Sequence, residues 1–268
     1  MVGSGSGDTR VILSDGRLID APPRVVPPAD VRGVFTTVGC EQGRVLLWER
    51  HRQRLLQSLW VALPEVGHLL PREDQLLELL QVEGLGAGSA GLRVVVGLGE
   101  RPWVEACAAA APEVGSSREP VRLKVESWKE PPDAAHKIIA RQKWHQESEN
   151  ARADGFDDVL LVDREERILE TSVANVFVRR RGIVVTPPAP RRCLPGLMRG
   201  WLLENLASVG FFVEERDIQL EELLKGDEVW ITNSLNGALR VGGVDKQRWA
   251  EWSGHRRLVE MGLPAPGW

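Results

Sequence analysis

Tyrosine is absent from this chain of 268 residues, and cysteine occurs only three times. A ligand site in this protein therefore cannot use a phenol hydroxyl, and its polar contacts must come from other groups. Cys40, Cys107 and Cys193 are far apart, and none of them belongs to a CxxC pair. This spacing argues against a disulfide framework and against a zinc site, and it predicts reduced thiols in a cytoplasmic protein.

Long apolar runs are also missing. No window approaches about 18 uninterrupted apolar residues, and the start MVGSGSGDTR has no apolar segment behind basic residues. We therefore expect a protein that is neither exported nor inserted in a membrane. The formal net charge of -4 gives no basic surface for nucleic acid, and the arginine runs at 50–54 and 179–181 are typical of a solvated helix face and a hairpin turn.

Several catalytic motifs are absent as well. The chain has no Walker A loop, no HExxH and no GxSxG, and its five histidines are not spaced as metal ligands. The glycines from Gly84 to Gly88 lack the spacing and the preceding strand of a dinucleotide-binding loop. Nucleotide-binding and serine-hydrolase functions are therefore disfavoured, and we expect no metal.

The chain does contain the pattern of a folded protein with mixed secondary structure. Alternating apolar residues between turns predict strands at 11–19 around Asp15-Gly16, 33–38, 45–48, 92–98, 103–109, 121–125, 159–162, 168–170, 173–178, 183–186, 211–214 and 228–232. Helical spacing predicts helices from residue 49 to before Pro64, from Pro71 to before Gly84, at 139–153, from Pro195 to Gly210 and at 220–224. Strands outnumber helices without strict alternation, which predicts the α+β class.

A polar segment with two prolines, Ala111–Pro120, is the clearest break in composition. It predicts a domain boundary, with an N-terminal domain at residues 1–111, a linker at 112–120 and a C-terminal domain at 121–268.

Four local features could carry chemistry, although each has a plainer interpretation. The segment Cys193–Gly200 predicts a helix start, whose unpaired N–H groups suit a phosphate, but most such starts bind nothing. The cluster Thr232-Asn233-Ser234 could bind an anion or only form a turn. Lys137 could form a Schiff base, act as a general base or be an ordinary surface lysine. Glu170, at a strand end, could pair with a protonated ring nitrogen or with an arginine.

In their order along the chain, these features resemble fold-type IV pyridoxal-phosphate enzymes, the class IV aminotransferase family. The resemblance covers about Gly33 to Gly243 and rests on six segments: GVFTTV, ERHRQRLLQSL, HKIIARQ, DDVLLVDREERILETSVANVFV, TPPAPRRCLPGLMR and DEVWITNSLNGALRV. The separation of Lys137 and Glu170 is also similar to that in the family. Branched-chain aminotransferases, D-amino acid aminotransferases and 4-amino-4-deoxychorismate lyases make up this group.

The resemblance implies a site for pyridoxal 5'-phosphate. Lys137 matches the Schiff-base lysine, which also moves protons, and Glu170 matches the acid that pairs with the pyridinium nitrogen. Arg54 matches the arginine that contacts the phosphate. The backbone N–H groups that cap the phosphate are matched by Leu197 and Met198, and the second phosphate-binding turn is matched by Asn233 and Ser234.

The resemblance also implies a small N-terminal α/β domain, a larger C-terminal β-barrel-like domain with helices, the cofactor between them, and a homodimer. Three positions depart from the family. Ala140 stands where relatives often carry Asn, and Gln142 stands where transaminases carry a Tyr near the cofactor's phenolic oxygen. The loop from Pro27 to Gly33 lacks the Gly-Asp-Gly run that is common there.

Within the family, Phe35-Thr36-Thr37 and Asn233-Ser234-Leu235 look most like the 4-amino-4-deoxychorismate lyase branch. The small hydroxyls of Thr36 and Thr37 would leave room for a cyclic dicarboxylate substrate and could hydrogen-bond it, or they could be ordinary strand residues. The implied reaction releases pyruvate and gives 4-aminobenzoate for folate biosynthesis. The candidate partners of the substrate carboxylates are Arg32, Arg93 and Arg240.

Two other functions stay open. One is a branched-chain or D-amino acid aminotransferase of the same fold, and the other is a non-catalytic protein that binds the cofactor or a partner.

Overall fold

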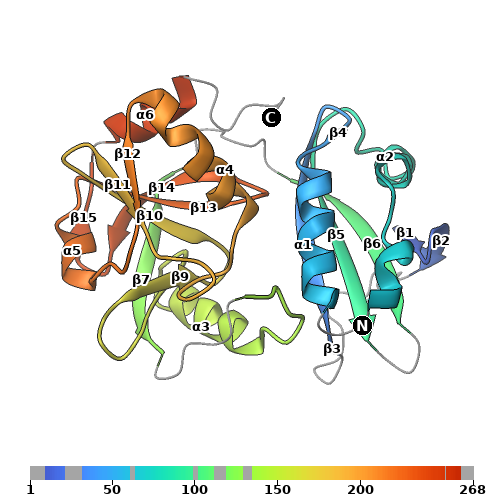
Figure 1. Cartoon of the computed structure of the whole chain (residues 1–268), viewed down its shortest axis with the longest axis horizontal. Coiled ribbons are helices and arrows are strands. Elements are labelled where there is room, and N and C mark those ends of the chain that lie inside the picture. The colour runs from blue at the N-terminus through green and yellow to red at the C-terminus, as the bar shows by residue number, and fades with distance from the viewer. Residues whose placement is uncertain are drawn as a thin grey trace, which may run out of the picture. The chain divides into compact units, whose positions relative to one another are not determined.

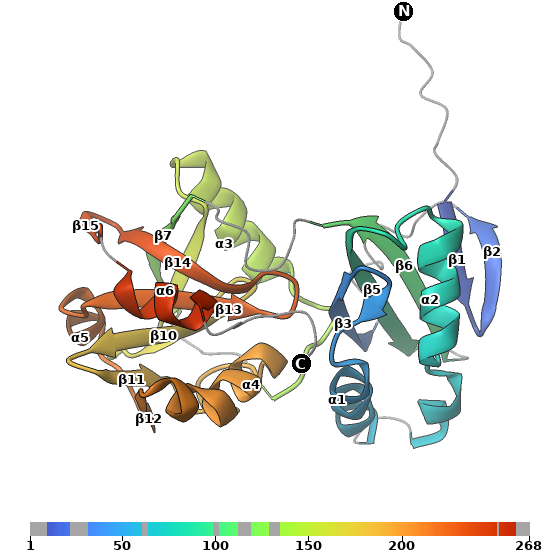
Figure 2. The same cartoon turned by 90° about the horizontal axis from the view of Figure 1, so that it is seen from above.

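The structure, a computed structural model, describes residues 10–21, 32–60, 64–98, 102–111, 119–128, 135–250 and 252–260. Within these residues the chain forms two compact units. The first unit contains the described residues up to 111 together with Ile138–Ala140, and the second contains the others. Each unit is built on one sheet (Figures 1 and 2). This architecture confirms the predicted α+β fold, with a smaller N-terminal α/β unit and a larger barrel-like C-terminal unit.

The first unit is a six-stranded sheet with the order β2-β1-β6-β5-β3-β4. Its strands are β1 (Arg10–Ser14), β2 (Arg17–Ala21), β3 (Arg32–Glu41), β4 (Arg44–Val45), β5 (Ser89–Leu98) and β6 (Trp103–Ala110). Its helices are α1 (Trp48–Trp60), the 3-10 turn η1 (Pro64–Leu69) and α2 (Glu73–Val82). Leucines of α1 and α2 pack on one face of this sheet and form its core. The opposite face carries a second small cluster of Phe35, Val95 and Ile139.

The second unit is a nine-stranded curled sheet with the order β12-β11-β10-β13-β14-β7-β8-β9, and β15 pairs with β14. Its strands are β7 (Val121–Ser127), β8 (Asp158–Val162), β9 (Ile168–Thr171), β10 (Asn175–Arg180), β11 (Ile183–Thr186), β12 (Phe212–Glu215), β13 (Glu228–Asn233), β14 (Gly237–Val244) and β15 (Gln247–Arg248). Its helices are α3 (Gln142–Ala153), α4 (Leu197–Asn205), the 3-10 turn η2 (Leu206–Val209), α5 (Leu220–Leu224) and α6 (Ser253–Glu260).

The helices of the second unit cover different parts of its sheet (Figures 1 and 2). The helix α3 packs on β7 and β8 through a cluster around Trp128 and Trp144. The helices α4 and α6 share another cluster, in which Met198 and Leu258 meet Trp230 of β13. A third cluster contains Leu160, Val176 and other strand residues, together with Leu223 of α5.

Three expectations from the sequence differ from the structure. The helix predicted at 139–153 begins only at Gln142, because the preceding residues form a bridge between Ile138 and Val34 of β3. The strand predicted at 45–48 is shorter, since β4 ends at Val45 and α1 begins at Trp48. The sequence pattern did not predict β14, β15 or α6. Most of the predicted linker at 112–120 and most of the loop at 27–33 lie outside the described residues.

Among the residues that the structure describes, no helix is both long and apolar enough to cross a membrane.

Candidate functional site

Glu170 lies on the short strand β9, and its carboxylate is almost completely buried. One carboxylate oxygen, Oε2, accepts a hydrogen bond of 3.0 Å from the backbone N–H of Leu194. The other, Oε1, is 3.4 Å from the Nη2 of Arg141. A carboxylate offers about four acceptor positions, so Glu170 can still accept a proton donor from a ligand.

The backbone that contacts Glu170 leads directly to the start of α4. The carbonyl of Leu194 accepts a hydrogen bond of 2.8 Å from the Nδ2 of Asn175 on β10. Asn175 also packs against Gly196, where a Cβ would lie 1.9 Å from its Oδ1. Gly196 is the N-cap of α4, so Leu197 and Met198 begin the helix there. The first N–H groups of a helix have no acceptor within the helix and carry its positive dipole end, which suits a phosphate.

The end of β13 lies beside this helix start. Thr232 pairs with Asn175 across β10 and β13, so both side chains lie on the same face of the sheet. The hydroxyl of Thr232 is buried and has no hydrogen-bond partner among the described residues. Asn233 accepts hydrogen bonds from the N–H groups of Leu235 and Asn236, at 3.0 and 2.8 Å, which fixes the turn that carries Ser234.

These parts suit a small heterocycle that carries a phosphate. Glu170 offers a buried negative charge to a protonated ring nitrogen, while the α4 start and the Ser234 turn offer N–H and hydroxyl donors to an anion. Leu194 and Leu197 are three residues apart, and three extended residues span at most about 10 Å. The charge at one end and the donors at the other are thus held apart by one short, well-anchored loop.

Lys137 is half-buried and is the last residue of a coil segment of the second unit, before the chain passes to the first unit. The three residues that follow it belong to the first unit, where the N–H of Ile139 donates a 3.0 Å hydrogen bond to the carbonyl of Gly33. Arg141 then returns the chain to the second unit and precedes α3. The segment that carries the lysine is therefore fixed at its C-terminal side in both units.

Arg141 is buried beside Glu170 and was not marked by the sequence patterns. Its Nη2 also donates to the carbonyl of Ser172 at 3.3 Å, and its guanidinium lies 4.3 Å from the ring centroid of Trp144. Burial lowers the pKa of Arg141, and the neighbouring Glu170 opposes that effect. The sequence pattern placed Arg141 inside the helix predicted at 139–153, so no local signal marked it.

A second polar cluster lies in the first unit and contains Arg54, Thr36 and His51. Thr36 Oγ1 is 2.5 Å from His51 Nδ1 and accepts a 2.7 Å hydrogen bond from Arg54 Nη2. All three side chains are buried. Because a guanidinium only donates, the Thr36 hydroxyl is left to donate its own proton to His51. His51 was also missed, although it lies one helical turn before Arg54 in the HRQR segment.

Thr36 and Thr37 point to opposite faces of β3. Thr36 pairs with Val94, which belongs to the core under α1 and α2, whereas Thr37 pairs with Arg93 on the other face. Thr36 is completely buried, while Thr37 is half-buried. The sequence grouped the two threonines as substrate contacts, but the structure gives them different surroundings.

Arg93 is the most distinctive of the three arginines proposed as carboxylate partners. Its guanidinium lies 4.5 Å from the ring centroid of Phe35, and within the described part of the chain it has no hydrogen bond or ion pair. Burial lowers the pKa of Arg93. Arg240 stacks on Trp252 at 5.0 Å and has a further interaction. The side chain of Arg32 lies outside the described residues.

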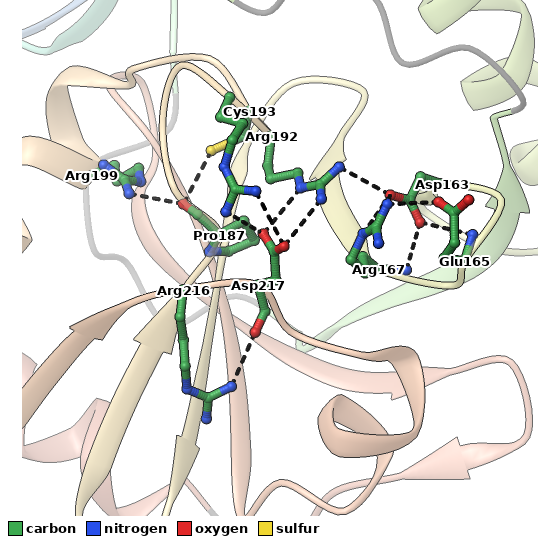
Figure 3. Close-up of polar contacts among 10 residues, drawn as sticks. Asp163, Glu165, Arg167, Pro187, Arg192, Cys193, Arg199, Arg216 and Asp217 are labelled. Carbon is green, nitrogen blue, oxygen red and sulfur yellow. Dashed lines mark hydrogen bonds and ion pairs between the residues drawn. The ribbon is translucent and has the colours of Figure 1, made fainter.

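A network of arginines and carboxylates anchors the loop that precedes α4 (Figure 3). Arg192 binds Asp163 at 3.1 Å and Asp217 at 3.0 Å, and so joins the turn after β8 to the segment after β12. At the same loop, Arg199 donates to the carbonyl of Pro187 at 2.8 Å. The thiol of Cys193 is buried, which raises its pKa to about 12 and makes it unreactive.

No cluster of metal-ligating side chains occurs among the residues that the structure describes. The two departures after the lysine, Ala140 and Gln142, are both exposed, and Gln142 begins α3.

Comparison with known proteins gives a consistent picture. A model of the family described as amino-transferase class IV matches residues 33–244. The aminodeoxychorismate lyase of Vibrio harveyi is 28% identical over 234 residues, which are 79% of this chain and 83% of that protein. Branched-chain-amino-acid aminotransferase 1 (mitochondrial) of Arabidopsis thaliana is 35% identical over 96 residues, which are 35% of this chain and only 25% of that protein.

Among solved structures, the branched-chain aminotransferase of Thermoproteus uzoniensis with norvaline superposes with a TM-score of 0.82 at 21% sequence identity. The superposition covers 94% of this chain and 93% of that chain. At this level of identity the likeness concerns the fold alone.

Proposed function

The chain belongs to the class IV amino-transferase family, whose members depend on pyridoxal 5'-phosphate, and we propose that it is a 4-amino-4-deoxychorismate lyase. Such an enzyme removes pyruvate from its substrate and gives 4-aminobenzoate, a precursor of folate. The observation that supports a lyase best is the extent of the match to the Vibrio harveyi lyase, which is 79% of this chain, against 35% for the plant aminotransferase.

The buried carboxylate of Glu170 is the observation that best supports the cofactor. It is tied by Leu194 to the start of α4, where Gly196 has no room for a side chain beside Asn175. A protonated pyridine nitrogen and a phosphate would find a partner at the two ends of this loop. The unpartnered hydroxyl of Thr232 supplies a further donor near the phosphate end.

In this proposal each residue has a separate role toward the cofactor or the substrate. Pyridoxal phosphate supplies an aldehyde that binds amines and a ring that stores negative charge. Lys137 would hold the cofactor through that aldehyde, and its amine would take the proton from C4 of the substrate when it is free. Glu170 would pair with the ring nitrogen and favour its protonated form. The phosphate would be held by Arg54, by the N–H groups of Leu197 and Met198, and by Asn233 and Ser234.

The substrate side of the site is assigned to β3 and β5. Arg93 is half-buried, carries no ion pair in the described part of the chain and so suits a substrate carboxylate. Thr37 lies on the same face, and we propose it as a hydrogen-bond partner of the substrate. A direct substrate contact of Thr36 is less favoured, because its hydroxyl already forms hydrogen bonds with Arg54 and His51.

The cofactor can be tested with purified protein and two lysine variants. We expect the wild-type protein with added pyridoxal phosphate to show a visible absorption band that borohydride bleaches. Lys137→Ala should lack this band, whereas Lys225→Ala, which changes an exposed lysine paired with Glu221, should keep it. A wild-type protein that never develops the band would contradict the proposal, and a band kept by Lys137→Ala would contradict the role of Lys137.

The reaction needs a separate assay. The wild-type enzyme should convert aminodeoxychorismate into pyruvate and 4-aminobenzoate in equal amounts. The second candidate, a branched-chain or D-amino acid aminotransferase, is favoured by the 35% identity to the plant aminotransferase. Rapid amino transfer between amino acids and 2-oxo acids, without release of 4-aminobenzoate, would decide for it. A non-catalytic protein would bind the cofactor and do neither.

The homodimer and the cytoplasmic location stay predictions. Sedimentation of the purified protein at several concentrations would test the first.

A further inference from the structure

The carboxylate assigned to the cofactor nitrogen already has a cationic neighbour inside the protein. Arg141 Nη2 lies 3.4 Å from Glu170 Oε1, and the two side chains are only 9% and 8% exposed. Water therefore screens this pair weakly, and each charge acts strongly on the other. Glu170 does not present an isolated negative charge to a ligand.

Most N–H donors of the Arg141 guanidinium form no hydrogen bond with the described residues. Its hydrogen bonds within the described residues come from Nη2 alone, to Glu170 and to the carbonyl of Ser172. An arginine has five N–H donors, and no nitrogen of Arg141 is among the fully buried atoms without a partner, so its other donors stay accessible to solvent or to a ligand. The stack on Trp144 holds the plane of the guanidinium and fixes its position beside the carboxylate.

The position of Arg141 in the chain links the two ends of the candidate site. It is four residues after Lys137, and the intervening Ile138–Ala140 are held on the first unit. Its side chain reaches Glu170, and its backbone carbonyl accepts the N–H of His145 in the first turn of α3. Arg141 is therefore close to Lys137 along the chain and close to Glu170 in space.

We propose that Arg141 is a positioning residue. Its positive charge offsets the negative charge of Glu170, so the bound cofactor loses its proton more readily. This inference rests on the proposed function, because it takes the cofactor nitrogen to face Glu170. A nearby positive charge disfavours any cationic form, so the cofactor should lose its proton at a lower pH than it would beside Glu170 alone. The simpler alternative is that Arg141 only fixes the start of α3.

The test is the pH titration of the visible band of the bound cofactor, which a purely structural role would not shift. Arg141→Gln removes the charge and should raise the pH midpoint of the band by about 0.5 unit or more. Arg141→Lys keeps the charge and should return the midpoint to within about 0.2 unit of the wild-type value. Arg122→Gln is the matched control, since Arg122 also stacks on an aromatic ring, Phe156, in the same unit, and it should leave the midpoint unchanged.

A second measurement does not need the cofactor. In the cofactor-free protein, the thermal midpoints of Arg141→Gln, Glu170→Gln and the double variant should be non-additive, with the double variant losing less than the sum of the two single losses. If Arg141→Gln does not fold, Arg141→Met can replace it, because Met keeps an aliphatic stem on Trp144. Its visible band should show the same rise in pH midpoint.

The outcomes separate this inference from the proposed function. A normal wild-type band with an unshifted midpoint in Arg141→Gln would overturn only the role of Arg141. A wild-type protein that binds no cofactor would overturn the proposed function, and this inference with it. A raised midpoint that Arg141→Lys restores, together with non-additive thermal midpoints, would support the shared charge.

Discussion

Two glycines four residues apart differ sharply in what they tolerate. A Cβ at Gly196 would lie 1.9 Å from the Oδ1 of Asn175, whereas a Cβ at Gly200 would have no atom within 4 Å. Gly196→Ala should therefore displace Asn175, break its bond to Leu194 and cost about 1–3 kcal/mol of unfolding free energy. Gly200→Ala lies inside α4 and should instead stabilise the protein by about 0.5–1 kcal/mol. Urea denaturation measures both, and equal effects of the two variants would contradict the tight packing at Gly196.

The buried cluster around Thr36 leads to a second prediction on single residues. Thr36→Val keeps the shape of the side chain but removes the oxygen that binds Arg54 and His51, so it should cost about 1–3 kcal/mol of unfolding free energy. Thr37→Val changes a half-buried strand residue and should stay within about 0.5 kcal/mol of the wild type. Thermal unfolding of the cofactor-free proteins compares them. A loss at Thr37 that matched the loss at Thr36 would refute this difference between the two faces.

The sequence predicted the residues to which we assign chemistry, but it did not predict the buried residues that contact them. Lys137, Glu170 and Arg54 stand out once they are read in order along the chain. Arg141 and His51 contact Glu170 and Thr36 only after folding, and no local pattern marks a residue whose partner is 29 or 15 positions away. The different surroundings of Thr36 and Thr37 also depend on which face of β3 the helices cover.

At the scale of elements, α6 is attached through one buried carboxylate. Glu228 on β13 is 1% exposed and accepts hydrogen bonds from Arg179, from the indole of Trp230 and from the N–H groups of Gly254 and His255. Glu228→Gln removes the charge that binds the N-terminus of α6 and should cost about 3 kcal/mol. Glu221→Gln, in an exposed pair with Lys225, should change stability by less than about 0.5 kcal/mol.

Hydrogen exchange would locate the effect of Glu228→Gln. We expect faster exchange of the amides in α6, with β3 and β5 of the first unit unchanged. Protection of α6 at the wild-type level would show that its apolar contacts, such as Leu258, hold it without the carboxylate.

The loop before α4 should be sensitive to acid. Its Arg192 forms hydrogen bonds with Asp217 and thereby lowers the pKa of Asp217 from its ordinary value of 3.8. A lowered pKa stabilises the folded state above the ordinary value, and this stabilisation is lost as the pH falls through the folded-state pKa. The wild-type protein should lose unfolding free energy below about pH 4, and Asp217→Asn should reduce that slope and cost about 1 kcal/mol at neutral pH.

Urea denaturation between about pH 3 and pH 7 tests this prediction. Glu214→Gln, whose partner Arg216 is exposed, serves as the control and should keep the wild-type slope. An unchanged slope in Asp217→Asn would mean that the network around Arg192 (Figure 3) does not contribute to acid stability.

Most elements could be predicted because each has a local signal. The turn at Asp15-Gly16 and the one at Gln42-Gly43 have positive φ angles at both central residues, as tight hairpins require. The helix α3 was predicted three residues too early, since Ile138 and Ile139 continue its apolar pattern but are used by the first unit. Packing of a short segment on a unit that is distant in sequence cannot be seen in a local sequence window.

The packing of Ile138–Ala140 on the first unit gives a prediction at the scale of the whole molecule. Ile139 is 6% exposed and packs with Phe35 and Val95 on the first unit, although it lies in the C-terminal half of the chain. Ile139→Ala should cost about 2–4 kcal/mol and speed hydrogen exchange in β3 and β5. Ile138, its neighbour, is 36% exposed, so Ile138→Ala should cost less than about 1 kcal/mol and leave this exchange unchanged.

The same variant should act on the candidate site, because Ile139 lies between Lys137 and Arg141. Loosening this segment frees both residues at once, so Ile139→Ala should weaken cofactor binding by about tenfold, which corresponds to about 1.4 kcal/mol. Titration of the visible band with pyridoxal phosphate would measure this, with Ile138→Ala as the control. Weaker binding with unchanged exchange in β3 would place the effect in the second unit alone. Faster exchange in β3 and weaker binding together would mean that the packing of the first unit sets the position of the lysine segment.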